Sequence, residues 1–124
     1  MLLVFWSSAA ESDPGLLSLL SRVQQRYGGD HFQLVALTDD PADTVRTLAQ
    51  RLPFPVLADA GGRVAARYRV AGLPTAVFVG PDGRRAGRLS PPLDEAALTE
   101  AVERLIAHAR ARARRSVVGF ETKG

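Results

Sequence analysis

The stretch that decides the fold is Gly72-Leu73-Pro74-Thr75-Ala76-Val77-Phe78-Val79-Gly80-Pro81-Asp82-Gly83. Its apolar centre, residues 75–79, is typical of a buried strand. In the turn that follows, proline fixes one backbone dihedral angle and glycine supplies another. Residues 84–89 then return as a more polar strand. The sequence therefore predicts an antiparallel hairpin at the edge of a sheet.

Upstream of this hairpin, two apolar strands flank an amphipathic helix. Residues 2–6 and 32–37 are almost entirely apolar, as expected for strands covered on both faces. Between them, apolar side chains recur at helical spacing from Leu16 to Tyr27. We predict that this helix starts at Asp13-Pro14, with the aspartate as N-cap, and ends at Gly28-Gly29. A strand–helix–strand unit of this kind makes the two strands parallel.

The remaining segments complete one layered domain. A second helix is predicted from Asp39-Asp40-Pro41 to about Leu52, followed by an extended piece at residues 56–57 and a short helix at 62–68. A final helix begins near Asp94. We therefore predict a single-domain α/β fold with a mixed central sheet and helices on both faces.

Composition excludes several classes of protein. The chain has 124 residues, 46% hydrophobic and 23% charged, which excludes a disordered, collagenous or coiled-coil protein. It contains no cysteine, so it has no disulfide, no thiolate nucleophile and no cysteine metal site. The apolar run at residues 1–6 is too short to span a bilayer and lacks the pattern of a signal peptide.

Charge is unevenly distributed along the chain. Residues 1–103 carry a net charge of −2 and residues 104–124 a net charge of +5, which together give the +3 of the whole chain. We therefore divide the chain into a domain at residues 1–109 and a basic C-terminal tail at 110–124, which we expect to be flexible. The tail is either a solvated helix end or an adhesive segment for an acidic partner, anionic lipid or RNA.

Several segments resemble the TlpA/ResA-like thiol-disulfide oxidoreductases and the related AhpC/TSA family, bacterial proteins with a thioredoxin-like fold. The family carries Phe-Trp-Ala-Thr-Trp-Cys-Pro-Pro-Cys where this chain has Phe5-Trp6-Ser7-Ser8-Ala9-Ala10-Glu11-Ser12-Asp13. Further similar positions are Phe54-Pro55-Val56-Leu57, Asp59, Gly62, Ala65, Tyr68, Val70, Gly72-Leu73-Pro74-Thr75 and Pro81-Asp82-Gly83. The resemblance covers roughly residues 2–106 and implies the thioredoxin-like fold, with a cis peptide bond before Pro74.

The active site of the family is not retained. Ala10 and Asp13 stand where the resemblance places the two cysteines, with Glu11 and Ser12 between them. Disulfide exchange needs one thiolate to attack and one thiol to resolve the mixed disulfide, so no catalytic residue is assigned at these four degenerate positions. We interpret Asp13 as a helix N-cap, and a catalytic role for it is the alternative.

The same resemblance points to a peptide-binding loop. In the active relatives, the backbone before the cis-proline pairs with an extended peptide, a mode of recognition that requires no sulfur. The candidates here are Leu73, Pro74 and Thr75, together with Trp6. The alternative is that Pro74 only fixes a tight turn and that Trp6 belongs to the core.

Other site chemistries lack support in the sequence. Ser7, Ser8 and Ser12 have no nucleophile-elbow motif around them and no histidine nearby. His31 and His108 are far apart in sequence without acidic partners at ligand spacing, so neither a metal nor a cofactor is predicted. We interpret the acidic group of Asp39, Asp40 and Asp43 as the first turn of a helix rather than a cation site.

These observations favour a redox-inactive, non-enzymatic thioredoxin-like domain that binds a peptide or protein partner. The first alternative is a member of a thiol-disulfide oxidoreductase system whose redox chemistry comes from a partner or from sequence outside this chain. The second is an assembly module that acts through the basic tail. We expect no sequence-specific nucleic-acid partner, and the oligomeric state is open. The protein is expected to be cytoplasmic as written, and periplasmic or membrane-tethered if its true N-terminus lies upstream.

Overall fold

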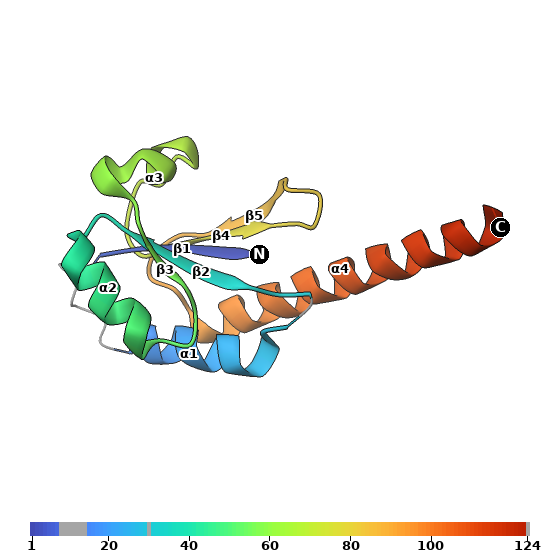
Figure 1. The fold of residues 1–124 in the computed structure, drawn as a ribbon, viewed down its shortest axis with the longest axis horizontal. Helices are drawn as coiled ribbons and strands as arrows, with labels where there is room; N and C mark the ends of the chain where they lie inside the picture. Colours follow the sequence, from blue (N-terminus) through green and yellow to red (C-terminus); the bar gives the residue numbers. More distant parts are fainter. Residues whose placement is uncertain (8–14, 30, 124) are drawn as a thin grey trace.

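The computed structural model describes residues 1–7, 15–29 and 31–123, with side chains up to residue 114. Five strands form one mixed sheet in the order β3-β2-β1-β4-β5 (Figure 1). The parallel strands are β1 (Leu2–Trp6), β2 (Leu34–Thr38) and β3 (Val56–Ala58). The strand β4 (Thr75–Val79) is antiparallel to both of its neighbours, β1 and β5 (Arg85–Leu89). The predicted mixed sheet and its edge hairpin are thus confirmed.

The strand β1 lies at the centre of the sheet because its side chains are apolar on both faces. All five of its residues are buried. It pairs with β2 in parallel, from Leu2 opposite Leu34 to Trp6 opposite Thr38. On its other side it pairs with β4 in the antiparallel sense, ending at Phe5 opposite Thr75.

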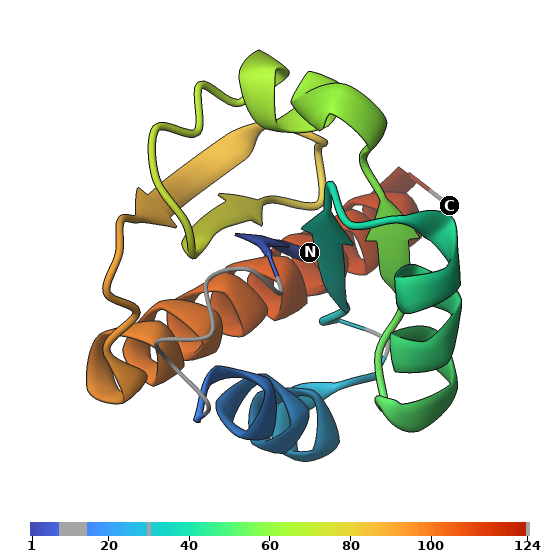
Figure 2. The same ribbon diagram turned by 90° about the vertical axis from the view of Figure 1, so that its left-hand side faces the viewer.

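One face of the sheet is covered by three helices. They are α1 (Leu16–Tyr27), α2 (Ala42–Arg51) and the first half of α4 (Glu95–Lys123). Figure 2 shows α1 and α4 on the side of the sheet away from α3. The apolar stripe of α1 and the inward side of α4 pack on the sheet and form the main core, which includes Leu2, Val4, Trp6, Leu20, Val45, Phe78, Leu98 and Val102.

The opposite face is covered by a smaller layer. A 3₁₀ turn, η1 (Ala60–Gly62), leads into α3 (Arg63–Arg67). Val64, Ala65 and Tyr68 pack against a second cluster of sheet residues, and the Tyr68 ring lies 5.9 Å from the ring of Phe5. Helices therefore cover both faces of the sheet, as predicted.

Two boundaries differ from the sequence prediction, those at the starts of α2 and β2. The helix α2 begins after Pro41, which occupies the N-cap position, and no side chain caps this helix. Asp40 accepts a hydrogen bond of 2.5 Å from the Thr38 hydroxyl instead. Phe32 is buried but lies before β2, where it forms an isolated bridge with Gly29. The described part of α1 begins at Leu16 with Gly15 as its N-cap, and the predicted start at residues 13–14 lies outside the described residues.

The last helix extends well beyond the body of the protein. The backbone is helical from Glu95 to Lys123, and the final turns of α4 project past the sheet (Figure 1). The segment at 110–124, expected to be a separate flexible tail, continues the same helix as the end of the domain through Lys123. The division at residue 109 stays a prediction.

Candidate functional site

The candidate site lies at the end of the sheet where the three parallel strands have their last residues. The last residues of β1, β2 and β3 are Trp6, Thr38 and Ala58, respectively. Because β4 runs antiparallel to β1, its first residue, Thr75, lies at this same end, opposite Phe5. The Leu73-Pro74 dipeptide therefore approaches the carboxyl end of β1, where the chain continues into residues 8–14.

Within the loop, one side chain is buried and one is exposed. Thr75 is 3% exposed, and its hydroxyl donates a 2.5 Å hydrogen bond to the Gly72 carbonyl oxygen. Pro74 is half-buried, whereas 40% of Leu73 is exposed. The Leu73–Pro74 peptide bond is cis. The Leu73 side chain is thus accessible at the surface of the loop.

The backbone at Leu73 lies where the β1–β4 pairing stops. Met1 and Val79 exchange two hydrogen bonds, of 2.7 and 2.8 Å. In an antiparallel pair such doubly bonded positions recur every second residue, which selects Leu3 with Val77 and Phe5 with Thr75. Leu73 is the next position in this series. In the described part of the chain, neither its N–H nor its C=O forms a hydrogen bond.

The other predicted site residues are not brought into this loop. Only 8% of Trp6 is exposed and it belongs to the main core, so its ring supports packing rather than contact with a peptide. Ala10, Glu11, Ser12 and Asp13 lie outside the described residues, as does Ser8. Asp59, which the family resemblance included, has a structural role: its carboxylate accepts hydrogen bonds from the Val64 and Ala65 amides at 2.9 and 3.0 Å.

The remaining polar candidates among the described residues do not assemble into a reactive cluster. No group of three or more potential metal ligands occurs among the described residues. His31 and His108 line different clefts. Asp43 lies on the first turn of α2 and forms an exposed ion pair of 3.5 Å with Arg46. The site therefore has no arrangement for general acid–base or metal-assisted catalysis within the described part of the chain.

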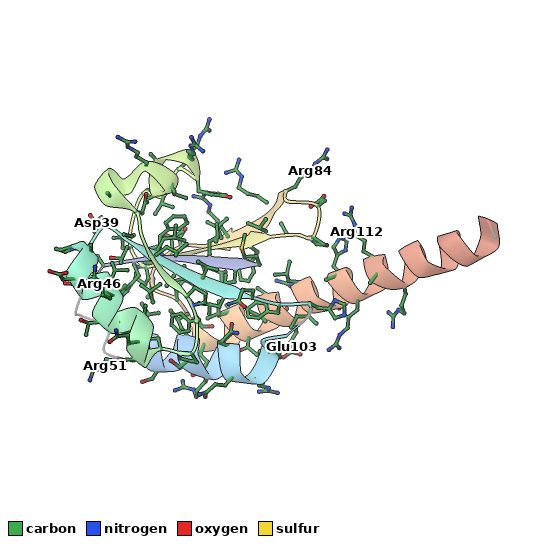
Figure 3. The ribbon with its side chains drawn as sticks, viewed as in Figure 1. Asp39, Arg46, Arg51, Arg84, Glu103 and Arg112 are labelled. Atoms are coloured by element: carbon green, nitrogen blue, oxygen red, sulfur yellow. The ribbon has the colours of Figure 1, made fainter. Side chains whose placement is uncertain are left out.

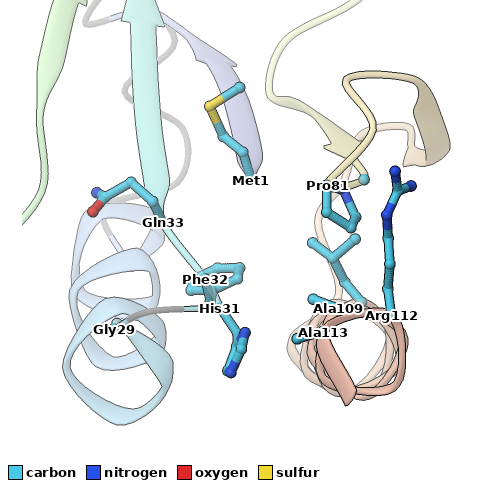
Figure 4. Close-up of a pocket in the computed structure, with 11 residues that line it drawn as sticks. Met1, Gly29, His31, Phe32, Gln33, Pro81, Ala109, Arg112 and Ala113 are labelled. Atoms are coloured by element: carbon cyan, nitrogen blue, oxygen red, sulfur yellow. The ribbon is translucent and has the colours of Figure 1, made fainter. Parts of the chain in front are cut away.

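A cleft that the sequence did not indicate lies at the opposite end of the sheet (Figure 4). It has a volume of about 450 Å³ and is bounded on one side by Phe32 and Gln33 and on the other by Pro81 and α4. His31 and Arg112 are its titratable side chains. Its walls come from segments far apart in sequence, so no local motif could have revealed it.

Comparison with solved structures decides the fold. A putative thioredoxin from Neisseria meningitidis superposes with a TM-score of 0.75 at 23% identity, over 84% of this chain and 72% of that one. The chain has the thioredoxin fold. A secreted disulfide oxidoreductase from Mycobacterium tuberculosis gives 0.70 at 24% identity, over 84% and 80%. A thio-disulfide isomerase from Thermus thermophilus gives 0.66 at 27% identity, over 82% and 75%.

The expected thioredoxin-like fold is therefore confirmed, and the similar solved structures are thiol-disulfide oxidoreductases of this fold. No protein-family model and no curated protein sequence matches this thioredoxin-fold chain. The chain contains no cysteine, so it cannot perform thiol chemistry by itself. None of the described helices is long and apolar enough to cross a membrane.

Proposed function

We propose that this protein is a redox-inactive thioredoxin-fold domain that binds an extended peptide segment at Leu73-Pro74-Thr75. The observation that carries the proposal is the backbone of Leu73 at the end of the β1–β4 ladder, which forms no hydrogen bond within the described part of the chain. An extended chain that docks there would satisfy these groups by strand addition, in which main-chain hydrogen bonds provide affinity. The exposed Leu73 side chain adds an apolar contact.

Recognition is the part of the fold's chemistry that does not need sulfur. Strand addition uses amide and carbonyl groups, which every sequence provides. The names of the similar structures, such as the Mycobacterium tuberculosis disulfide oxidoreductase, describe activities of those proteins. For this chain we propose the retained binding step without the exchange step. Its partner is then a protein segment rather than a small molecule or a cofactor.

The proposal is tested with peptides selected from a random displayed library against the intact chain. Binding of a selected fluorescent peptide is measured by anisotropy. We expect Leu73→Asp to weaken binding about tenfold, or about 1.4 kcal/mol. Leu57→Asp is the matched control, because Leu57 is also an exposed leucine, on the edge strand β3, and it should bind normally. N-methylation of alternate peptide amides should abolish binding, since it removes the main-chain donors.

Two results would overturn the proposal. Equal affinity of the wild type and Leu73→Asp would show that this loop is unused. Loss of binding in Leu57→Asp alone would place the peptide on β3, the edge strand at the other side of the sheet. The compartment also stays a prediction with two outcomes, cytoplasmic or exported, and cell fractionation of the native protein decides between them.

A further inference from the structure

Although residues 1–103 together carry a net charge of −2, one segment within them is strongly basic. Residues 60–90 contain six arginines and one acidic residue, a net charge of +5. This segment builds η1, α3 and the β4–β5 hairpin. Of the other acidic residues whose side chains are described, Asp43 lies in α2, Glu95, Glu100 and Glu103 lie in the first half of α4, and Asp39, Asp40 and Asp94 lie in the loops before these helices. The exception is Asp59, which is buried and accepts hydrogen bonds from the Val64 and Ala65 amides. Most of the charge that averages out along the chain is therefore separated in space.

The fold places these arginines on one face of the sheet. In β5, Arg85 pairs with Val79 and Arg88 with Val77. Both valines belong to the cluster under α3, and cross-strand partners point to the same face. A register shift between Phe78 and Val79 adds one residue to β5, so Arg85 and Arg88 share this face although they are three residues apart.

The helix α3 adds a second row of arginines on the same side. Arg63 and Arg67 are four residues apart and therefore adjacent on the helix surface. Arg69 follows in a left-handed conformation with φ of 54°. The Arg88 guanidinium donates hydrogen bonds to the carbonyl oxygens of Tyr68 and Arg69, which fixes β5 to the end of α3. We call the set Arg63, Arg67, Arg69, Arg84, Arg85 and Arg88 the arginine face.

All six of these side chains are exposed, and none of them forms an ion pair in the described part of the chain. The ion pairs in the described part of the chain involve Arg22, Arg46, Arg104 and Arg112 instead. The acidic residue of the segment, Asp82, is already occupied: it accepts the Arg84 amide at 3.0 Å and lies 3.9 Å from Arg112. Figure 3 shows Arg84 on the β4–β5 turn and Arg112 on α4 near the same end of the hairpin.

We propose that the arginine face binds the phosphate backbone of double-stranded nucleic acid without sequence preference. Arginine binds phosphate oxygens through two parallel hydrogen bonds, and a row of such contacts follows a duplex backbone. The large exposed apolar residues of the described chain are Met1, Leu57 and Leu73, all outside the arginine face. It therefore offers no exposed aromatic ring to stack on single-stranded bases and no apolar side chain to insert into a bilayer.

The test uses the intact chain and a fluorescent duplex of random sequence, with binding measured by anisotropy over a series of salt concentrations. Arg88 is already bonded to two carbonyl oxygens, so the other five arginines predict a slope of log K against log salt of about −4.5. The double variant Arg67→Gln/Arg85→Gln should make this slope less negative by about 2 and weaken binding at least tenfold. Circular dichroism checks that the fold is unchanged.

The matched control is Arg22→Gln/Arg46→Gln. It makes the same change in net charge at exposed arginines of α1 and α2, and we expect nearly wild-type binding. An equal loss in both double variants would overturn the proposal, because the attraction would then follow net charge rather than this face. Loss of binding on deletion of residues 115–124, with Arg67→Gln/Arg85→Gln unaffected, would assign binding to the end of α4.

Other ligands form the last arms of the experiment. Tighter binding to a single strand than to the duplex would contradict the proposal, since it would require base stacking. Binding to phosphatidylserine vesicles but not to the duplex would contradict it in favour of a membrane surface. A duplex signal that appears only together with self-association of the chain, measured by sedimentation, would also overturn it. Loss of duplex binding in Arg67→Gln/Arg85→Gln, with peptide binding intact, would separate this face from the proposed peptide loop.

Discussion

At the scale of single residues, Asp59 shows how one buried carboxylate orders a segment. It is 6% exposed, accepts the Val64 and Ala65 amides, and donates its own N–H to the Thr38 carbonyl oxygen at 2.7 Å. We expect Asp59→Ala to lower the free energy of unfolding by about 1–2 kcal/mol, since two amides at the start of α3 lose their acceptor. Urea denaturation measures this. Asp43→Ala, at a carboxylate that is 94% exposed, should change stability by less than about 0.5 kcal/mol. Equal effects would show that the capping bonds contribute nothing.

Tyr27 provides a pH-dependent contact between α1 and α4. Its hydroxyl donates a 3.0 Å hydrogen bond to Glu103, and partial burial, followed by this bond, raises the pKa of Tyr27 above 10.0. A pKa raised by folding means that the contribution to stability is present below about pH 10 and is lost as pH rises through the folded pKa.

Ultraviolet difference absorbance in a Tyr68→Phe background follows Tyr27 alone, because the chain has two tyrosines. When Glu103→Gln is added to this background, we expect Tyr27 to ionise at a lower pH than in the Tyr68→Phe protein alone. The reason is that a nearby negative charge no longer opposes formation of the tyrosinate. Identical titration curves would exclude the influence of Glu103.

At the scale of elements, the first half of α4 holds the main core together. Leu98 is fully buried and Leu105 and Ile106 are nearly so. We expect Leu98→Ala to cost about 2–5 kcal/mol of unfolding free energy through lost apolar burial and a residual cavity. Glu100→Ala, on the exposed side of the same helix with a 3.1 Å ion pair to Arg104, should cost less than about 0.5 kcal/mol. Thermal unfolding of both variants checks the contrast, and a loss below 1 kcal/mol for Leu98→Ala would mean that the site collapses around the smaller side chain.

The sequence could predict the elements whose pattern is local. The apolar run of β1 and the hairpin turn at residues 81–83 each determine their own conformation. The cap of α2 could not be predicted, because Asp40 bonds to the hydroxyl of Thr38, and nothing in the pattern decides between that partner and the helix amides.

The arginine face could not be predicted from net charge for a related reason. The basic segment at residues 60–90 is evident in the sequence. Its place on one face depends on the register of β5 against β4 and on the bulge between them, which a sum of charges along the chain does not contain. In the candidate site, the exposure of Leu73 and the burial of Trp6 required tertiary packing, which no local motif specifies.

At the scale of the whole molecule, the absence of cysteine predicts a complete loss of thiol chemistry. The intact chain should not accelerate the reduction of insulin disulfides by dithiothreitol, because no thiolate is available. The double variant Ala10→Cys/Asp13→Cys should gain measurable turnover if these positions correspond to the family's cysteines, since the N-terminus of a helix stabilises a thiolate. Turnover by the wild type would contradict the assignment, and a folded but inactive double variant would contradict the alignment of residues 5–13.

The end of α4 that protrudes from the body of the protein should not be needed for the stability of the fold. Among the side chains of α4 described up to residue 114, the last buried one is Ile106. The backbone stays helical to Lys123, about 25 Å further on at 1.5 Å per residue. We expect deletion of residues 115–124 to change the free energy of unfolding by less than about 0.5 kcal/mol, as measured by urea denaturation. Deletion from residue 105 onwards should destabilise the protein by several kcal/mol, because Leu105 and Ile106 leave the core.

If the shorter deletion also destabilises the protein, the end of α4 must pack against another surface. A dependence of that effect on protein concentration would identify a second copy of the chain as the partner.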